Sequence, residues 1–96
     1  METNHHFYVV KCKDGSFYAG YTNDLANRMS VHNAGKGAKY TRARLPVMLI
    51  HYEIFETKQE AMRAEYAFKQ LSRMKKIDYL RNRGVDENEN TKKLCK

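Results

Sequence analysis

A strand–turn–strand pattern near the N-terminus constrains the fold of this chain more than any other stretch. Two runs of bulky, β-favouring residues, 7–12 and 16–21, lie close together in the sequence. Between them, Asp14 can hydrogen-bond its own backbone and Gly15 tolerates a positive φ. The pattern therefore predicts an antiparallel β-hairpin.

The remainder of the chain predicts one further strand and several helices. Asn23 or Asp24 can cap a first helix, and Thr57 with Glu60 forms a capping-box pattern for a later one. We expect the third strand inside the sheet, because polar residues rarely interrupt it. The expected fold is α+β, a three-stranded antiparallel sheet flanked by helices. The elements after the hairpin are a helix over 24–34, a flexible basic loop over 35–44, a strand over 47–55, and helices over 57–72 and 73–83.

Polar side chains of unusual type gather where the predicted hairpin meets the first helix. Tyr8 and Tyr18 lie on the two paired strands. Arg28 and His32 are one helical turn apart and flank the apolar stripe that begins at Leu25, so both should border the sheet. Strand tyrosines usually serve packing, and an arginine can rest its stem on a core while its head reaches water. The combination of all four nevertheless favours a functional site.

The helix over 57–72 places a carboxylate near its buried face. Glu65 falls inside or beside the apolar stripe, where an unpaired charge is unfavourable without a counter-charge, hydrogen bonds or a metal. The alternative is that Glu65 leans outward and pairs with Lys69. The stripe itself consists of Ala61, Ala64, Phe68 and Leu71, and the last helix should turn Met74, Ile77 and Leu80 inward.

The charge of the chain points to a polyanionic partner. Its formal net charge is +7, and its isoelectric point is near 9.5. Nucleic acid is the first candidate and an anionic membrane surface the second. By charge alone, a soluble protein that is merely basic is an equally good interpretation. The Gly35-Lys36-Gly37 segment lacks the Walker A pattern. The expected contacts to nucleic acid are Lys36, Lys39, Tyr40, Arg42, Lys69 and Arg73.

Length and composition favour a single domain. The chain has 96 residues, for which we expect one folded domain over 1–83 and a disordered polar tail over 84–96. Cys12 and Cys95 are too few and too far apart for a disulfide framework, so both are expected as reduced thiols. No apolar run approaches the ~20 residues that span a bilayer. We therefore expect a cytoplasmic protein with no membrane association, and the oligomeric state stays open.

His51, in the third predicted strand, has no partner at ligand spacing. We therefore interpret it as a core or edge histidine whose hydrogen bonds are satisfied, and not as a metal ligand.

Several of these positions together resemble a known family. The chain resembles the GIY-YIG nuclease superfamily at two tripeptides, His6-Phe7-Tyr8 and Tyr18-Ala19-Gly20, and at Arg28, His32 and Glu65. Within it, the chain is similar to the small stand-alone bacterial proteins of the UPF0213 type, from residue 6 to about residue 80. His6 replaces the first glycine of the pattern and Ala19 an isoleucine, while Tyr21 stands where a repair branch often carries lysine.

The resemblance implies an endonuclease that hydrolyses phosphodiester bonds in DNA or structured RNA with the help of a metal. It implies that Tyr8 or Tyr18 is the general base while the other positions water or phosphate, and that Glu65 holds one Mg²⁺ or Mn²⁺ ion. The guanidinium of Arg28 suits a phosphate because it is always charged and donates in pairs. His32 could orient a tyrosine hydroxyl or carry a proton.

Two other functions stay open. A catalytically silent nucleic-acid-binding module could use the same scaffold, and the small size favours it because related nucleases usually carry a separate DNA-binding domain. A protein-interaction adaptor, the weakest alternative, would show no salt-sensitive binding of nucleic acid. For the first two functions the partner is nucleic acid, with DNA preferred to RNA.

Overall fold

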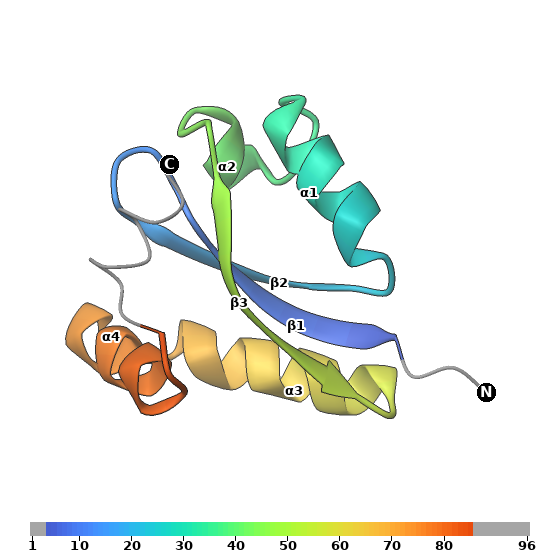
Figure 1. Ribbon diagram of the computed structural model, residues 1–96, viewed down its shortest axis with the longest axis vertical. Helices are drawn as coiled ribbons and strands as arrows, with labels where there is room; N and C mark the ends of the chain where they lie inside the picture. The colour runs from blue at the N-terminus through green and yellow to red at the C-terminus, as the bar shows by residue number, and fades with distance from the viewer. Residues whose placement is uncertain (1–3, 86–96) are drawn as a thin grey trace.

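The computed structural model of the protein describes residues 4–85, and an antiparallel sheet forms its middle layer (Figure 1). Helices α1 and α2 lie on one side of the sheet, and α3 and α4 lie on the other. This arrangement confirms the predicted α+β class. In chain order the elements are β1 (His5–Lys11), β2 (Phe17–Thr22), α1 (Leu25–Asn33), α2 (Lys39–Arg42), β3 (Met48–Phe55), α3 (Lys58–Lys69) and α4 (Arg73–Asn82).

The strand order is β2-β1-β3, so β1 is the central strand. In the hairpin, Tyr8 pairs with Gly20 and Val10 with Tyr18. The prediction that β3 lies inside the sheet is wrong, because among the strands of residues 4–85 β3 pairs with β1 alone and occupies an edge. Its apolar side chains are only partly covered, and Tyr52 and Ile54 are 49% and 52% exposed. The uninterrupted apolar run that is buried on both faces belongs to β1, over residues 7–10.

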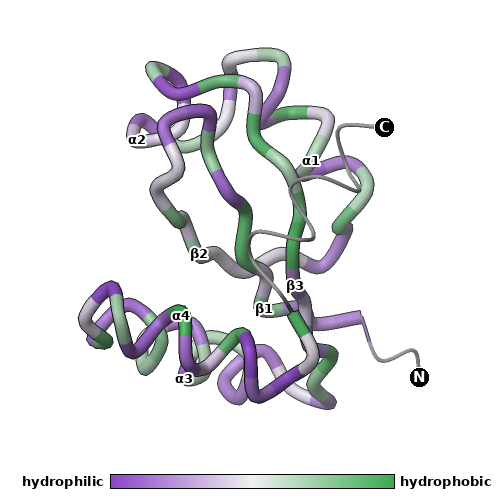
Figure 2. Tube along the Cα trace, turned by 60° about the vertical axis from the view of Figure 1, so that its left-hand side comes forward, coloured by the Kyte–Doolittle hydropathy of each residue, from purple (hydrophilic) through white to green (hydrophobic). Residues whose placement is uncertain are grey.

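The two faces of the sheet carry separate apolar clusters. Figure 2 shows hydrophobic residues along the strands and at intervals along the helices. On the α3 side, Phe7 and Phe68 pack with Leu80, and Ala64 and Leu71 cover the margin, as the predicted stripe requires. The other cluster consists of Tyr8, Val10, Cys12 and Val47, with Leu25 and Met29 of α1 packed against it.

The chain-reversal signal and the helix N-caps operate as predicted. Asp14 Oδ1 accepts hydrogen bonds from the amide and the hydroxyl of Ser16, and Gly15 has a φ of +87°. The carboxylate of Asp24 caps α1, and the hydroxyl of Thr57 accepts from the amide of Glu60 at 3.1 Å to cap α3. Local side-chain chemistry therefore sets the beginning of both helices.

Three expectations about the helical segments need correction. The basic loop contains a four-residue helix, α2, which has no side-chain cap and so leaves no sequence signal. Met74 does not turn inward and is 76% exposed, while Tyr79 of the same helix packs against the core instead. Val85 is buried in that core, so the folded part continues beyond residue 83. The rest of the expected tail, Cys95 included, lies outside the described residues.

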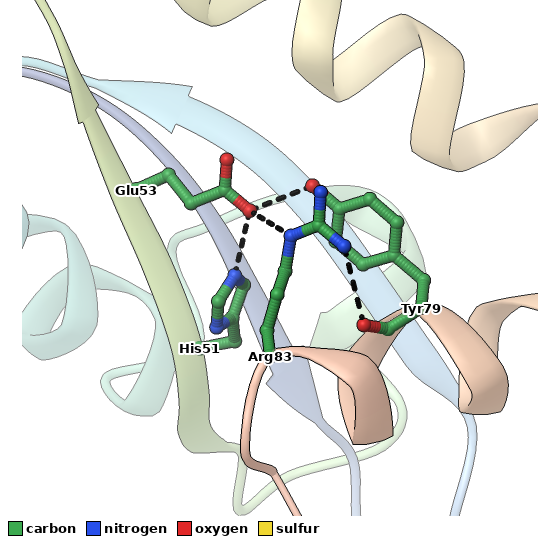
Figure 3. A network of polar contacts seen from close by, with 4 residues as sticks. All are labelled: His51, Glu53, Tyr79 and Arg83. Atoms are coloured by element: carbon green, nitrogen blue, oxygen red, sulfur yellow. Dashed lines mark hydrogen bonds and ion pairs between the residues drawn. The ribbon is translucent and has the colours of Figure 1, made fainter.

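A polar network attaches α4 to β3 (Figure 3). One carboxylate oxygen of Glu53 accepts hydrogen bonds from His51 at 2.8 Å, Tyr79 at 2.6 Å and Arg83 at 3.0 Å. This confirms that His51 is a satisfied edge histidine. Burial tends to raise the pKa of Glu53, but the hydrogen bonds from His51 and Tyr79 and the charge of Arg83 outweigh it and lower that pKa.

Within residues 4–85, no helix has the length and apolar character needed to cross a membrane.

Candidate active site

All five predicted catalytic residues line one pocket of about 400 Å³. Helices α1 and α3 cover opposite faces of the sheet, yet both contribute side chains to this pocket. It must therefore lie where the two layers meet around an edge of the sheet, and β2 supplies three lining residues while β3 supplies none. The pocket is lined by Tyr8, Tyr18, Gly20, Tyr21, Arg28, His32, Lys36, Gly37, Ala38, Met62 and Glu65.

A chain of hydrogen bonds runs from the pocket into the protein through His32. The hydroxyl of Tyr8 lies 2.9 Å from Nε2 of His32, and Nδ1 of His32 lies 3.0 Å from the hydroxyl of Thr41. That hydroxyl donates its own proton to the carbonyl oxygen of Ala38, at 2.9 Å. It must therefore accept from Nδ1, which leaves Nε2 of neutral His32 unprotonated and ready to accept from Tyr8.

Burial keeps both members of the Tyr8–His32 pair neutral. Burial raises the pKa of Tyr8 well above its ordinary value, and the nearby Tyr18 adds to the rise, while Arg28 opposes it. Burial also lowers the pKa of His32, and the positive charge of Arg28 lowers it further. At neutral pH the site therefore holds a phenol that donates to an uncharged imidazole.

Two glycines allow these side chains to reach their positions. A Cβ at Gly20 would overlap the hydroxyl of Tyr8, and a Cβ at Gly37 would overlap the imidazole of His32. Gly20 corresponds to the glycine of the second family tripeptide. Gly37, in the segment that lacks a Walker A pattern, brings the backbone of the loop against the histidine ring instead.

The position of Glu65 agrees with both earlier interpretations, a residue of the site and an ion-pair partner of Lys69. It lines the pocket, and its carboxylate forms an ion pair with Lys69 at 2.8 Å. Within residues 4–85, no group of three or more His, Cys, Asp or Glu side chains is arranged to hold a metal ion. A single carboxylate in a water-accessible, polar pocket still fits Mg²⁺, which usually takes one or two carboxylates and fills its other positions with water and substrate phosphate.

The predicted nucleic-acid-binding residues differ in how closely they approach this pocket. Lys36 lines it, whereas Lys39 and Arg42 lie exposed on α2. Tyr40 stacks on Tyr18 with ring centroids 6.1 Å apart. Two of these cations lie over aromatic rings of β2. The Lys69 ammonium is 5.3 Å from the centroid of the Tyr18 ring, and the Arg73 guanidinium is 4.8 Å from that of Phe17.

The predicted site residues do not include two residues that shape the site, Thr41 and Arg44. Thr41 is fully buried and fixes the tautomer of His32, but a threonine in a basic loop carries no recognisable signal. The guanidinium of Arg44 lies 4.0 Å from the centroid of the Tyr40 ring and also pairs with Asp14 of the hairpin turn. Nothing in the sequence of the basic loop distinguishes Arg44 from the other cations there.

The class of protein is shown by a family model that covers most of the chain. A family model described as the GIY-YIG catalytic domain matches residues 4–78. The chain therefore belongs to the GIY-YIG family, as its sequence pattern predicted.

Within that family, the chain is similar to UPF0213 proteins of Bacillus. One from Bacillus velezensis is 68% identical over 81 residues, which are 83% of this chain and 82% of the relative. The UPF0213 protein YazA of Bacillus subtilis is 61% identical over 93 residues, which are 96% and 89% of the two chains.

Solved structures of similar proteins have the same fold. The solution NMR structure of a UPF0213 protein from Bacillus halodurans matches with a TM-score of 0.58 and 50% identity, over 94% of this chain and 95% of the other. A second solution NMR structure, of a protein from E. faecalis, matches with a TM-score of 0.60 and 49% identity, over 90% of this chain and 91% of the other.

Proposed function

We propose that the protein is a metal-dependent nuclease that hydrolyses phosphodiester bonds of nucleic acid in the Tyr8–Glu65 pocket, with DNA preferred to RNA. The observation that supports this most is the convergence of a hydrogen-bonded Tyr8–His32 pair, Arg28 and Glu65 on one polar pocket. Hydrolysis needs a proton acceptor, positive charge at the phosphate and an oxygen ligand for a divalent cation. The pocket offers all three.

The proton of the attacking water can leave through Tyr8 without a free phenolate. Because the Tyr8 hydroxyl donates to Nε2 of His32, its oxygen can accept a proton from water as it passes its own proton to the imidazole. The water oxygen then bonds to phosphorus, and the bond from phosphorus to the leaving oxygen breaks. The leaving oxygen takes a proton from solvent, and imidazolium His32 later returns its extra proton to solvent.

Arg28 and Glu65 serve the phosphate and the metal respectively. The guanidinium of Arg28 lines the pocket and can donate two hydrogen bonds to phosphate oxygens, whose negative charge grows in the transition state. Glu65 would hold the divalent cation, which when bound supplies Lewis-acid stabilisation of that charge. Lys69 must release the carboxylate of Glu65 for this role, since the two now form an ion pair.

A cleavage assay with three variants tests the proposal. Labelled single-stranded, duplex and branched DNA and structured RNA would each be incubated with Mg²⁺, Mn²⁺ or EDTA. We expect metal-dependent cleavage by the wild type and at least roughly 100-fold slower cleavage by Tyr8→Phe, Arg28→Ala and Glu65→Ala. Glu60→Ala is the matched control, because Glu60 lies exposed in the first turn of the same helix. Equal cleavage by the wild type and all three variants would exclude this site.

The second candidate is a nucleic-acid-binding module without turnover. It is favoured by the Glu65–Lys69 ion pair, which occupies the one carboxylate that the metal needs. In that case the wild type would cleave no better than Glu65→Ala at any metal concentration. It would still bind nucleic acid with an affinity that falls steeply as salt rises.

A further inference from the structure

A second pocket adjoins the candidate active site and shares one wall with it. It encloses about 240 Å³ between β2, α2, α3 and α4. The ring of Tyr18 lines both pockets, and Lys69 of the second pocket is the ion-pair partner of Glu65 in the first. The second pocket is lined by Phe17, Tyr18, Ala19, Tyr40, Phe68, Lys69 and Lys76.

The walls of this pocket combine aromatic rings with cations. The rings of Tyr18 and Tyr40 are stacked, with 21° between their planes. The ammonium groups of Lys69 and Lys76 lie 5.3 and 5.6 Å from the centroids of the Tyr18 and Phe68 rings. Aromatic faces stack on nucleobases, and cations beside them attract the phosphates that join those bases. A pocket of this composition matches one nucleotide better than it matches a bare phosphate.

Tyr40, in the wall of the second pocket, is partly exposed to solvent. Tyr40 is 40% exposed, although the Tyr18 ring and the Arg44 guanidinium contact it. The two contacts hold the ring in place, so little side-chain entropy would be lost when a base stacks on it. Tyr66 of α3 is a useful comparison, because it is 66% exposed and lines neither pocket.

We propose that the second pocket binds an unpaired nucleobase next to the phosphate that the active-site pocket holds. Inside a duplex, both faces of every base are covered by neighbouring bases, so aromatic walls can receive a base only after it has left the stack. The substrate class is therefore nucleic acid that is single-stranded, or has an unpaired nucleotide, at the cleavage position. This inference rests on the proposed nuclease function, because it places the base relative to the phosphate of that reaction.

Binding measured without cleavage tests the base pocket directly. A labelled oligothymidylate, a duplex of equal length and an abasic oligonucleotide of equal length would be titrated in EDTA, with fluorescence anisotropy as the readout. We expect oligothymidylate to bind most tightly. Tyr40→Ala should weaken its binding about 5- to 150-fold, the range for loss of one base–aromatic stack. Tyr40→Phe, which keeps the ring, and Tyr66→Ala should bind as the wild type does.

The abasic oligonucleotide separates stacking from attraction to phosphate. Its affinity should be the same for the wild type and Tyr40→Ala, because it offers no base. The inference is wrong if the wild type binds the abasic strand or the duplex as tightly as oligothymidylate. It is also wrong if Tyr40→Ala weakens all three ligands equally, or if no oligonucleotide binds. Melting temperatures of the variants would show whether each is folded.

Cleavage assays distinguish failure of this inference from failure of the nuclease proposal. Base-dependent binding without any metal-dependent cleavage would support the base pocket and contradict the proposed hydrolysis. The opposite result is metal-dependent cleavage that is equally fast for duplex and single strand and is unaffected by Tyr40→Ala. It would support the hydrolysis and contradict the base pocket.

Discussion

The hydroxyl of Tyr8 and Nε2 of His32 lie 2.9 Å apart, although 24 positions separate the two residues in the sequence. The contact joins the central strand of the sheet to α1 at the floor of the pocket. Under the proposed function, it would also let a tyrosine with a raised pKa take part in proton transfer, because the imidazole lies where it can receive the proton.

Loss of the Thr41 hydroxyl should slow cleavage through its effect on His32. In Thr41→Val, the Nδ1 proton of His32 loses its acceptor in a buried site, so the fixed tautomer is lost. We expect a decrease in kcat of roughly 10- to 100-fold, part of the contribution that general base catalysis makes. The free energy of unfolding should fall by about 1–3 kcal/mol. Thr41→Ser keeps the hydroxyl and should restore most of the rate, and a Thr41→Ser enzyme as slow as Thr41→Val would contradict the role of the hydrogen bond.

The dependence of cleavage on pH should reveal the relay through His32. The relay needs neutral His32, whose pKa lies below its ordinary value of 6.5, and protonated Tyr8, whose pKa is raised. The rate should therefore fall only on the acid side, below the usual histidine range, and stay level through neutral and mildly alkaline pH. A tyrosinate base would instead give a rate that rises with pH towards the ionisation of tyrosine. A kcat profile with metal held saturating distinguishes the two.

Alanine at Gly20 should damage both stability and activity. The new Cβ would overlap the Tyr8 hydroxyl, so the tyrosine ring must move away from His32. Overpacking of this kind destabilises a protein by about 1–3 kcal/mol. Gly84→Ala provides the control, since Gly84 has open space around its Cβ position and the substitution instead strains a positive φ of +86°. It should lower the melting temperature while leaving cleavage by the folded protein unchanged, whereas normal cleavage by Gly20→Ala would argue against the placement of Tyr8.

The network around Glu53 should stabilise the fold without affecting the chemistry. Glu53→Gln removes the charge that Arg83 pairs with and weakens the hydrogen bonds from His51 and Tyr79. We expect about 1–3 kcal/mol less stability at neutral pH in urea unfolding. The pKa of Glu53 is lower in the folded state than its ordinary 4.5, so its contribution is present above that value and is lost as pH falls towards the folded pKa.

At alkaline pH the same network should respond in the opposite direction, because stability is then lost as the pH rises. Burial, together with the hydrogen bond to Glu53, raises the pKa of Tyr79 from 10.0 to about 12. Its stabilising contribution should therefore be complete below pH 10.0 and disappear as the pH rises towards 12. In Glu53→Gln the loss on the alkaline side should be smaller. An unchanged alkaline limb in this variant would mean that the carboxylate does not hold the Tyr79 proton.

The parts of the fold that the sequence predicted are those with local causes. The turn at Asp14 and the cap at Asp24 depend on hydrogen bonds to the next few residues, and the structure has both. The position of β3 depends instead on which strand can bury both faces, and this is decided by competition with β1 across the whole sheet. For that reason β3 lies at the edge, although its mostly apolar sequence predicted a position inside the sheet.

The same division applies to the candidate site. Spacing within the hairpin and along α1 places Tyr8, Tyr18 and His32 near one another before any tertiary contact is known. Thr41 and Gly37 act only through contacts with His32 that the folding of the basic loop creates. Their residue types are common in loops, so the sequence holds no mark of their role.

The pocket lies where two helical layers meet around the edge of β2, and this has a consequence for a protein made on the ribosome. Tyr8, Tyr18, Arg28 and His32 leave the ribosome well before Glu65, which α3 carries to the pocket from the other side of the sheet. The N-terminal part of a chain is available to fold first during synthesis. A nascent chain that ends before α3 lacks the proposed metal ligand, so under the proposed function it could not yet cleave nucleic acid near the ribosome.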